Sequence, residues 1–448
     1  MDGLALTFAD ATASEALSDD RLLCAMAGFE AALAQACARA GLISARDAEV
    51  IASVCKTARF DASALASAAR KAGTLAIPFV RELTAQVAAA SPQAARHVHF
   101  GATSQDVQDT ALVLCLRKAN AHIDQRAVQL GDAAAAIAKE HADTPCLART
   151  LLQPALPVPF GWKAAVWLSL VSASLGAFRA SAKETCLLQF GGPAGTLSAY
   201  GEKSGAVEAA LAEELGLPIP DIPWHSRRDA LARFGAAAAA LAGAAGKVAW
   251  DVSLLMQPEL GEAAEAAGAG RGGSSSLPHK RNPAQSMLAL EAAQRAPGLV
   301  STLLVQITAE HERGLGQWQS QWLTLRDLLG ATASALAAMA EVLADLEVNV
   351  AAMRENIERM RGLVYSEALS IRLAAALGKQ EAHHLTEHLC ARAIESGLHL
   401  AEVARTDAQV RGTIDQDELS ALFQPQRCFG AAPAMIERAR AQWARVRA

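Results

Sequence analysis

The chain has 448 residues, 52% of them hydrophobic, and a formal net charge of −5. This is roughly two to three times the usual domain size, so we expect several domains or one extended helical body. The acidic balance gives no basic surface for nucleic acid or an anionic membrane, and we expect neither partner. An anionic ligand would therefore need a local group of cations.

Alanine supplies much of the apolar composition, since aromatic residues make up only 4% of the chain. The run AAAAALAGAAGKVAW at 236–250 is typical of closely packed helices, because alanine has the highest helix propensity and lets helix axes approach. We find no run of 18 or more strongly apolar residues and no basic, apolar leader at the N-terminus, so we expect no membrane span and no signal peptide. Eight scattered cysteines without CxxC pairs predict reduced thiols and a cytoplasmic protein.

Proline spacing divides the chain, because proline is rarely tolerated inside helices. We predict an N-terminal helical domain at 1–108, a central domain of long helices at 109–350, and a C-terminal helical domain at 351–448. Strand signals are few, which favours an all-α fold. The proline-free intervals, each long enough for helices of thirty residues or so, lie between Pro92 and Pro145, Pro159 and Pro193, Pro223 and Pro258, and Pro297 and Pro425.

Within these intervals, apolar residues recur at helical spacing. Trp167, Leu170, Val171, Ser174 and Phe178 form an i, i+3, i+4 stripe. A second pattern repeats every seven residues and predicts a long bundle helix. Its members are Leu231, Phe234, Ala238, Leu241, Ala245, Val248, Val252 and Leu255.

Three segments interrupt the helices with the residues typical of loops, and we expect functional residues there. They are HVHFGATSQDVQDTA at 97–111, ARTLLQPALPVPFG at 148–161 and GAGRGGSSSLPHKRNPAQ at 268–285. In the first, the hydroxyls of Thr103 and Ser104 at a helix N-terminus would suit an anion. A simple helix cap would need the same residue types.

The third segment has glycines and prolines around a basic stretch, His279 to Asn282. Its backbone N–H groups and hydroxyls could hold carboxylates while Lys280 supplies a point charge. By composition alone, a flexible Gly/Ser linker is an equal alternative.

The order of residues from Gly273 to Pro283, GSSSLPHKRNP, resembles the catalytic loop of the fumarase/aspartase superfamily, with Leu277 in place of the usual methionine. The resemblance implies that Ser274, or with less support Ser275, is the acid/base acting next to a substrate carboxylate. It also implies that Lys280 and Asn282 hold a carboxylate. A serine can do this only if amides, a cation and the exclusion of water stabilise its alkoxide.

The superfamily further implies three largely helical domains, a central bundle assembled from four chains, active sites shared between subunits, and no cofactor. The segment around Gly101 to Asp106 is similar to its carboxylate-binding turn, and His99 matches a substrate-contacting histidine of related lyases. We expect no metal, since the pair His383-His384 lacks acidic or cysteine companions at ligand spacing.

The segment RTLLQPALP at 149–157 resembles a superfamily region in which many members carry a catalytic histidine. Here the two positions concerned hold Leu151 and Pro154, and neither can transfer a proton. Expelling an amine, a purine or hydroxide commonly needs a general acid, whereas a carboxylate with a pKa near 4 leaves without one.

That departure favours the 3-carboxy-cis,cis-muconate cycloisomerase branch, which stretches such as 189–229, 253–262, 310–322 and 362–385 also resemble. The implied reaction adds a substrate carboxylate to a double bond, in the catabolism of protocatechuate. A tricarboxylate needs several donors, and we expect Gln153, Arg228 and Arg313 among them. The alternatives are another lyase, acting on a succinyl or fumarate-type substrate such as adenylosuccinate, and a noncatalytic helical scaffold.

Overall fold

The computed structural model describes residues 3–268, 272–274, 276–277 and 279–448. The chain divides into two compact units, each built from three stretches of sequence. The first comprises Met1–Ala127, Ser174–Gly246 and Leu288–Ala337, and the second comprises Val128–Ala173, Lys247–Met287 and Ala338–Ala448. The predicted division into 1–108, 109–350 and 351–448 is a different partition and stays a prediction.

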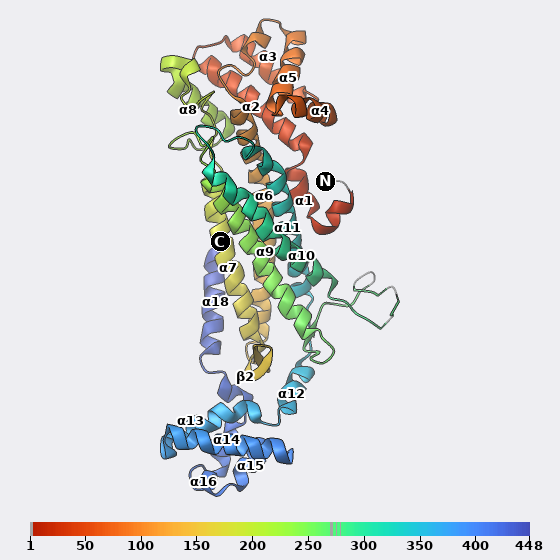
Figure 1. Cartoon of the computed structure of the whole chain (residues 1–448), viewed down its shortest axis with the longest axis vertical. Helices are drawn as coiled ribbons and strands as arrows, with labels where there is room; N and C mark the ends of the chain where they lie inside the picture. The colour runs from red at the N-terminus through yellow and green to blue at the C-terminus, as the bar shows by residue number, and fades with distance from the viewer. Residues whose placement is uncertain (1–2, 269–271, 275, 278) are drawn as a thin grey trace. The chain divides into compact units, whose positions relative to one another are not determined.

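Five long helices contribute residues to both units, in keeping with the predicted all-α fold (Figure 1). They are α6 (Ser104–Glu140), α7 (Phe160–Thr185), α9 (Asp229–Leu255), α10 (Ala284–Val305) and α11 (Gln321–Ala344). The predicted seven-residue pattern lies on α9, and all of its eight members are buried. On α7, the predicted stripe is buried except at Leu170, which is 38% exposed.

In the first unit, small residues let these helices approach closely. A side chain on Gly235 of α9 would meet Leu303 of α10 at 2.3 Å. The rings of Phe178 on α7 and Phe234 on α9 pack 5.5 Å apart. Such contacts explain why an alanine- and glycine-rich sequence forms this bundle, since larger residues at these positions would force the helix axes apart.

The remaining elements of the first unit are short helices around the long α2, and several begin with a side-chain cap. Asp10, Ser18, Ser44 and Asp61 each accept a hydrogen bond from the first turn of the helix that follows. These elements are η1 (Gly3–Phe8), α1 (Ala11–Ala16), α2 (Asp19–Arg39), α3 (Ala45–Thr57), α4 (Ala62–Ala72), α5 (Ala76–Ala90), η2 (Ala94–His97), η3 (Ser198–Lys203), α8 (Ser204–Leu215), η4 (Gln306–Thr308) and η5 (Trp318–Ser320).

The second unit contains the C-terminal helices and two small antiparallel sheets. The C-terminal helices share their own apolar core, which includes Leu369, Leu389 and Val410. The elements are β1 (Pro145–Thr150), β2 (Gln153–Pro159), β3 (Ala263–Ala264), β4 (Glu347–Val348), α12 (Val350–Arg359), η6 (Leu363–Tyr365), α13 (Ser366–Leu377), α14 (Lys379–Ser396), α15 (Leu400–Thr406), α16 (Ala408–Arg411), α17 (Gln416–Leu422), η7 (Pro425–Cys428) and α18 (Ala432–Arg447).

The segment at 148–161, expected as a loop, is largely a β-hairpin. Strands β1 and β2 pair antiparallel, with Thr150 opposite Gln153 and a register shift between Leu147 and Arg149. The sequence carries little β signal here, because four prolines lie in or beside the strands and the apolar residues do not alternate.

Four helices are long and apolar enough to span a membrane, judged by length and composition alone, where the sequence analysis expected none. They are Ala11–Arg39, Phe160–Thr185, Asp229–Leu255 and Trp318–Ala344. Between 56% and 72% of each apolar window is buried inside the protein itself. The high mean hydropathy therefore reflects alanine-rich helices packed against each other.

Candidate active site

The N-terminus of α6 is closed by the side chain of Asp106. The Asp106 carboxylate accepts the backbone N–H of Thr103 at 3.0 Å, three residues back along the chain. A side chain in the first turn that binds the N–H of the capping residue is the arrangement of a capping box. The turn before it requires glycine at 101, where φ is +72° and a Cβ atom would meet the Tyr200 ring at 2.5 Å.

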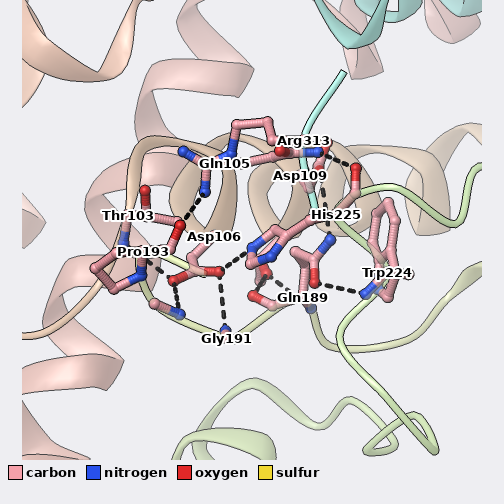
Figure 2. A network of polar contacts seen from close by, with 12 residues as sticks. Thr103, Gln105, Asp106, Asp109, Gln189, Gly191, Pro193, Trp224, His225 and Arg313 are labelled. Carbon is pink, nitrogen blue, oxygen red and sulfur yellow. Dashed lines mark hydrogen bonds and ion pairs between the residues drawn. The ribbon is translucent and has the colours of Figure 1, made fainter. Parts of the chain in front are cut away.

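Asp106 is fully buried and also binds two other segments (Figure 2). It accepts the backbone N–H groups of Gly191 at 3.0 Å and Gly192 at 2.9 Å, and its Oδ1 lies 2.7 Å from Nε2 of His225. With the Thr103 contact, four donors surround one carboxylate. A buried carboxylate with all of these partners fixes three segments to one another: the N-terminus of α6, the loop at Gly191 and Gly192 (the glycine loop), and the segment that carries His225.

A second buried contact joins Arg228 to Asp109, which lies one helical turn after Asp106 on α6. The Arg228 guanidinium binds both oxygens of Asp109, at 2.8 and 2.9 Å, and donates to Gln321 at 2.7 Å. It also stacks over the Trp224 ring at 5.0 Å and is only 1% exposed. The expectation was a direct substrate contact, but these partners already engage the guanidinium, which favours a role in holding the frame of the site.

The predicted anion-binding hydroxyls of Thr103 and Ser104 lie at the start of α6. Among the described residues, neither hydroxyl has a hydrogen-bond partner, and both residues are only partly buried. Arg313 is near the same network, since its guanidinium donates to the carbonyl of Pro193 at 3.3 Å, beside the glycine loop (Figure 2). In the first unit, the hydroxyls of Thr103 and Ser104 therefore lie on a segment that Asp106 fixes in place, and the partly buried Arg313 binds beside another such segment.

His99 precedes this turn in a left-handed conformation, with φ of +58°. Its Nδ1 lies 2.6 Å from Oε1 of the buried Glu30, whose Oε2 accepts the His99 backbone N–H at 3.0 Å. Burial disfavours a charged ring, but the attraction of Glu30 outweighs it and, with a smaller contribution from Asp106, raises the pKa of His99.

In the second unit, the loop that carries Ser274 is closed at its base by glycine and asparagine. The N–H of Asn282 donates to the carbonyl of Gly272 at 2.8 Å, and its side-chain amide donates to Gly273 at 3.3 Å. Gly272 has φ of +63°, and a Cβ atom there would meet the Asn282 carbonyl at 2.5 Å. Asn282 thus holds the loop together, in addition to any contact with a ligand.

Backbone amides point at the predicted acid/base. The Ser274 hydroxyl oxygen accepts the N–H of Leu277 at 3.1 Å and that of Ser276 at 3.4 Å. Donors aimed at this oxygen stabilise it more strongly when it is an alkoxide, so they lower the cost of deprotonation. The alternative base, Ser275, lies outside the described residues. The Lys280 side chain is exposed, and among the described residues it forms no ion pair.

Two carboxylates anchor the stems of this loop. Glu265 accepts the N–H of Gln285 at 3.1 Å and both the N–H and the hydroxyl of Ser286, at 2.8 and 2.7 Å. Glu347 accepts the N–H of Ala267 at 2.9 Å and pairs with Arg281 at 2.9 Å. The loop is therefore held at both of its ends.

The β1–β2 hairpin is held by an ion pair close to its turn, and the turn itself is exposed. Arg149 binds the buried Glu262 through both of its terminal nitrogens, at 3.0 and 2.6 Å. At the tip, Leu151 and Leu152 both have positive φ, +51° and +64°, and are 96% and 73% exposed. The Gln153 side chain, a predicted substrate contact, is also exposed.

The structure therefore groups the predicted residues by unit. His99, Thr103, Ser104, Arg228 and Arg313 belong to the first, and Gln153, Ser274, Lys280 and Asn282 to the second. Sequence reasoning missed most of the carboxylates that position them, because an acid that binds residues far away in the chain cannot be told from a surface charge by its neighbours in the sequence. The missed residues are Glu30, Asp109, Glu262, Glu265 and Glu347, whereas Asp106 is part of the segment that resembles the carboxylate-binding turn.

Comparisons with known proteins agree over the whole chain. Residues 7–298 match a family described as lyase, and residues 362–439 match the adenylosuccinate lyase C-terminus. The chain is 46% identical to a 3-carboxy-cis,cis-muconate cycloisomerase of Bradyrhizobium diazoefficiens, covering 95% of both chains. It is 47% identical to one of Pseudomonas aeruginosa, covering 95% of this chain and 93% of the relative. The crystal structure of a 3-carboxy-cis,cis-muconate lactonizing enzyme from Pseudomonas putida superposes with a TM-score of 0.93 at 40% identity, covering 99% of both chains.

Proposed function

The chain belongs to the lyase family that includes the 3-carboxy-cis,cis-muconate cycloisomerases, and we propose that it converts 3-carboxy-cis,cis-muconate to 4-carboxymuconolactone. The observation that carries the proposal is the full-length likeness to these enzymes, in sequence and in fold. The reaction is a step of protocatechuate catabolism and needs no cofactor. The cytoplasm is its proposed location.

In the proposed mechanism, a carboxylate oxygen of the substrate adds to one carbon of a double bond and forms the lactone C–O bond. The electron pair moves toward the neighbouring carbon and into the carboxylate attached there. Lys280 and the hydroxyls of Thr103 and Ser104 are our proposed donors to substrate carboxylates, since each is free of other partners among the described residues.

Ser274 then gives its hydroxyl proton to the carbon that bears the negative charge, which forms the new C–H bond. The resulting alkoxide is stabilised by the N–H groups of Leu277 and Ser276 and takes a proton from water. In reverse, the departing group is a carboxylate, which needs no acid. This is compatible with Leu151 and Pro154 in the hairpin.

We further propose that His99, Gln153, Asn282 and Arg313 contact the substrate and that Arg228 acts through Asp109 as a structural anchor. Asn282 has a second function in closing its own loop. Assigning Arg228 to the frame rather than to the substrate follows from its burial and its engaged guanidinium.

A homotetramer with shared active sites is part of the proposal. Large apolar side chains on the long helices are exposed in the single chain, as expected of surfaces that another copy covers. They include Val166, Leu170, Trp250, Met287 and Leu323, between 38% and 62% exposed. Light scattering of the purified protein tests this, and a monomer at micromolar concentration would contradict it.

The activity test follows the loss of conjugated-diene absorbance when purified protein is mixed with 3-carboxy-cis,cis-muconate. Adenylosuccinate, the substrate of the alternative function, is tested in a separate assay. We expect Ser274→Ala to abolish turnover with unchanged assembly mass. Ser301→Ala, an exposed serine on α10, is the matched control and keeps full activity. If Ser275→Ala were inactive and Ser274→Ala active, the acid/base would be the neighbouring serine; unchanged diene absorbance with wild-type protein would refute the reaction itself.

A further inference from the structure

One buried carboxylate outside the predicted site, that of Glu30 on α2, binds a single residue at two points. Its Oε2 accepts the backbone N–H of His99 at 3.0 Å, and its Oε1 lies 2.6 Å from the ring Nδ1. Glu30 is only 2% exposed. Taking such a charge out of water is costly unless its partners are well placed, so the contact with His99 is a strong constraint on both residues.

The backbone of His99 needs such a constraint. Its φ of +58° lies in the left-handed region, where a Cβ atom comes too close to the following carbonyl oxygen. The Glu30 contact to the backbone N–H offsets that strain and holds the residue four positions before Thr103. Strained residues of this kind concentrate at functional sites, where the surrounding structure over-determines them.

The other titratable groups near Glu30 are uncharged near neutral pH, so they do not neutralise its charge. Burial raises the pKa of the Cys37 and Cys55 thiols to about 12 each, and the charge of Glu30 adds to both shifts. Burial also raises the pKa of Tyr200, so all three neighbours are neutral near pH 7. Among the described residues, His99 is the sole basic side chain paired with Glu30.

On the side of His99, Glu30 and Asp106 are the charged groups that act on the ring, and both are negative. With Nδ1 bound to Glu30, the ring has Nε2 as its remaining nitrogen. Among the described residues Nε2 has no hydrogen-bond partner, and the side chain is 17% exposed. A carboxylate that orients a histidine and stabilises its charged form is a known device for presenting the second nitrogen to a substrate.

We propose that Glu30 is a positioning residue for the reaction: it fixes the ring and the positive charge of His99, whose Nε2–H then binds a carboxylate group of the substrate. The inference rests on the proposed function, because the substrate proposed there is a tricarboxylate and His99 would be one of the cations that bind it. Glu30 itself does not touch the substrate.

The test replaces the charge and keeps the shape. In Glu30→Gln, the amide oxygen still accepts the His99 backbone N–H, and the amide NH₂ faces Nδ1, so the ring stays in place but becomes neutral more readily. Binding of propane-1,2,3-tricarboxylate, an unreactive tricarboxylate, is measured by calorimetry from pH 5.5 to 8.5. At pH 7.5 we expect the variant to bind about ten-fold more weakly or worse, the loss expected for one charged hydrogen bond.

The pH dependence separates charge from structural damage. Since Glu30 raises the pKa of His99, wild-type binding persists to a higher pH than in the variant. Lowering the pH favours the imidazolium in Glu30→Gln, in which the amide turns its oxygen toward Nδ1, so the affinity of the variant should rise toward that of wild type as the pH falls to 5.5. His99→Asn, which tolerates the left-handed backbone, should lose affinity without recovery in acid. Adding Glu30→Gln to His99→Asn should cost nothing more.

Asp10→Asn is the matched control, because Asp10 pairs with His122 at 2.9 Å, another carboxylate–histidine pair of the same unit. Asparagine keeps the cap of α1, and affinity should not change. If Glu30→Gln does not fold, the His99 ring is titrated by NMR in wild type, and an ordinary or lowered pKa would overturn the inference.

Other outcomes distinguish this inference from the proposed reaction. Tight binding of the tricarboxylate without turnover of 3-carboxy-cis,cis-muconate would refute the reaction and leave the role of Glu30 standing. Normal turnover by wild type, together with a Glu30→Gln variant that binds and turns over like wild type at every pH, would refute the role of Glu30 alone.

Discussion

The backbone N–H of Leu277 makes the more direct of the two contacts to the Ser274 hydroxyl, and its removal tests how a serine can move a proton. Leu277→Pro deletes this donor, which lies 3.1 Å from the oxygen, while the N–H of Ser276, at 3.4 Å, remains. Only the first distance lies within the usual range for N–H···O bonds. We therefore expect most of the amide stabilisation of the alkoxide to disappear.

Loss of one such donor costs about 10² to 10³ in kcat, equivalent to about 2.7–4 kcal/mol. Because the donor acts on the oxygen of the enzyme and not on the substrate, KM should change little. Diene absorbance at saturating 3-carboxy-cis,cis-muconate gives kcat, and Leu277→Met, which keeps the N–H and nearly the same volume, is the control. A Leu277→Pro variant with kcat within about three-fold of Leu277→Met would refute the argument.

Three further predictions concern the frame of the site. Asp109→Ala leaves the buried Arg228 without its counter-charge and should lower the free energy of unfolding by about 3–5 kcal/mol, seen as a lower urea midpoint. Gly101→Ala places a methyl group against Tyr200 at positive φ and should reduce both stability and kcat/KM; unchanged values would show that the turn can relax. Replacing Leu151-Leu152 by Asn-Gly, the residues preferred where both central positions have positive φ, should raise the melting temperature, and a concurrent loss of activity would show that the leucines serve function.

Long helices could be predicted from the sequence because their signals are local and repeated. The seven-residue pattern along α9 names the buried face of that helix correctly at every position. The start of α6 at Ser104 was also predictable, since Thr103 and Asp106 have the spacing of a capping box. In both cases, the residues that decide the structure are neighbours in the sequence.

The hairpin and the carboxylate anchors could not be predicted in this way. Strands β1 and β2 form despite their proline-rich sequence, and Arg149, beside the turn that joins them, binds Glu262, which lies 113 positions away. Glu30 and His99 are 69 positions apart, and Arg228 and Asp109 are 119 apart. Each of these acids would be a surface charge by composition, and only tertiary contact distinguishes it.

The same distinction changes how Arg228 and His99 are interpreted. A motif match treated both as equal candidates for substrate contact, but the structure separates them by what surrounds each charge. The Arg228 guanidinium is buried among Asp109, Gln321 and Trp224, so a ligand would have to displace partners that are already in place.

His99 is held by one carboxylate on one ring nitrogen, and the other nitrogen has no partner among the described residues. Likewise, the Ser274 hydroxyl oxygen accepts two backbone N–H groups, and its own proton has no acceptor in the described part of the chain. In each case the surroundings stabilise a charge, the imidazolium or the alkoxide, and leave the reactive atom available. A hairpin without histidine is then sufficient, because the proposed leaving group is a carboxylate and the remaining tasks are one proton transfer and the binding of anions.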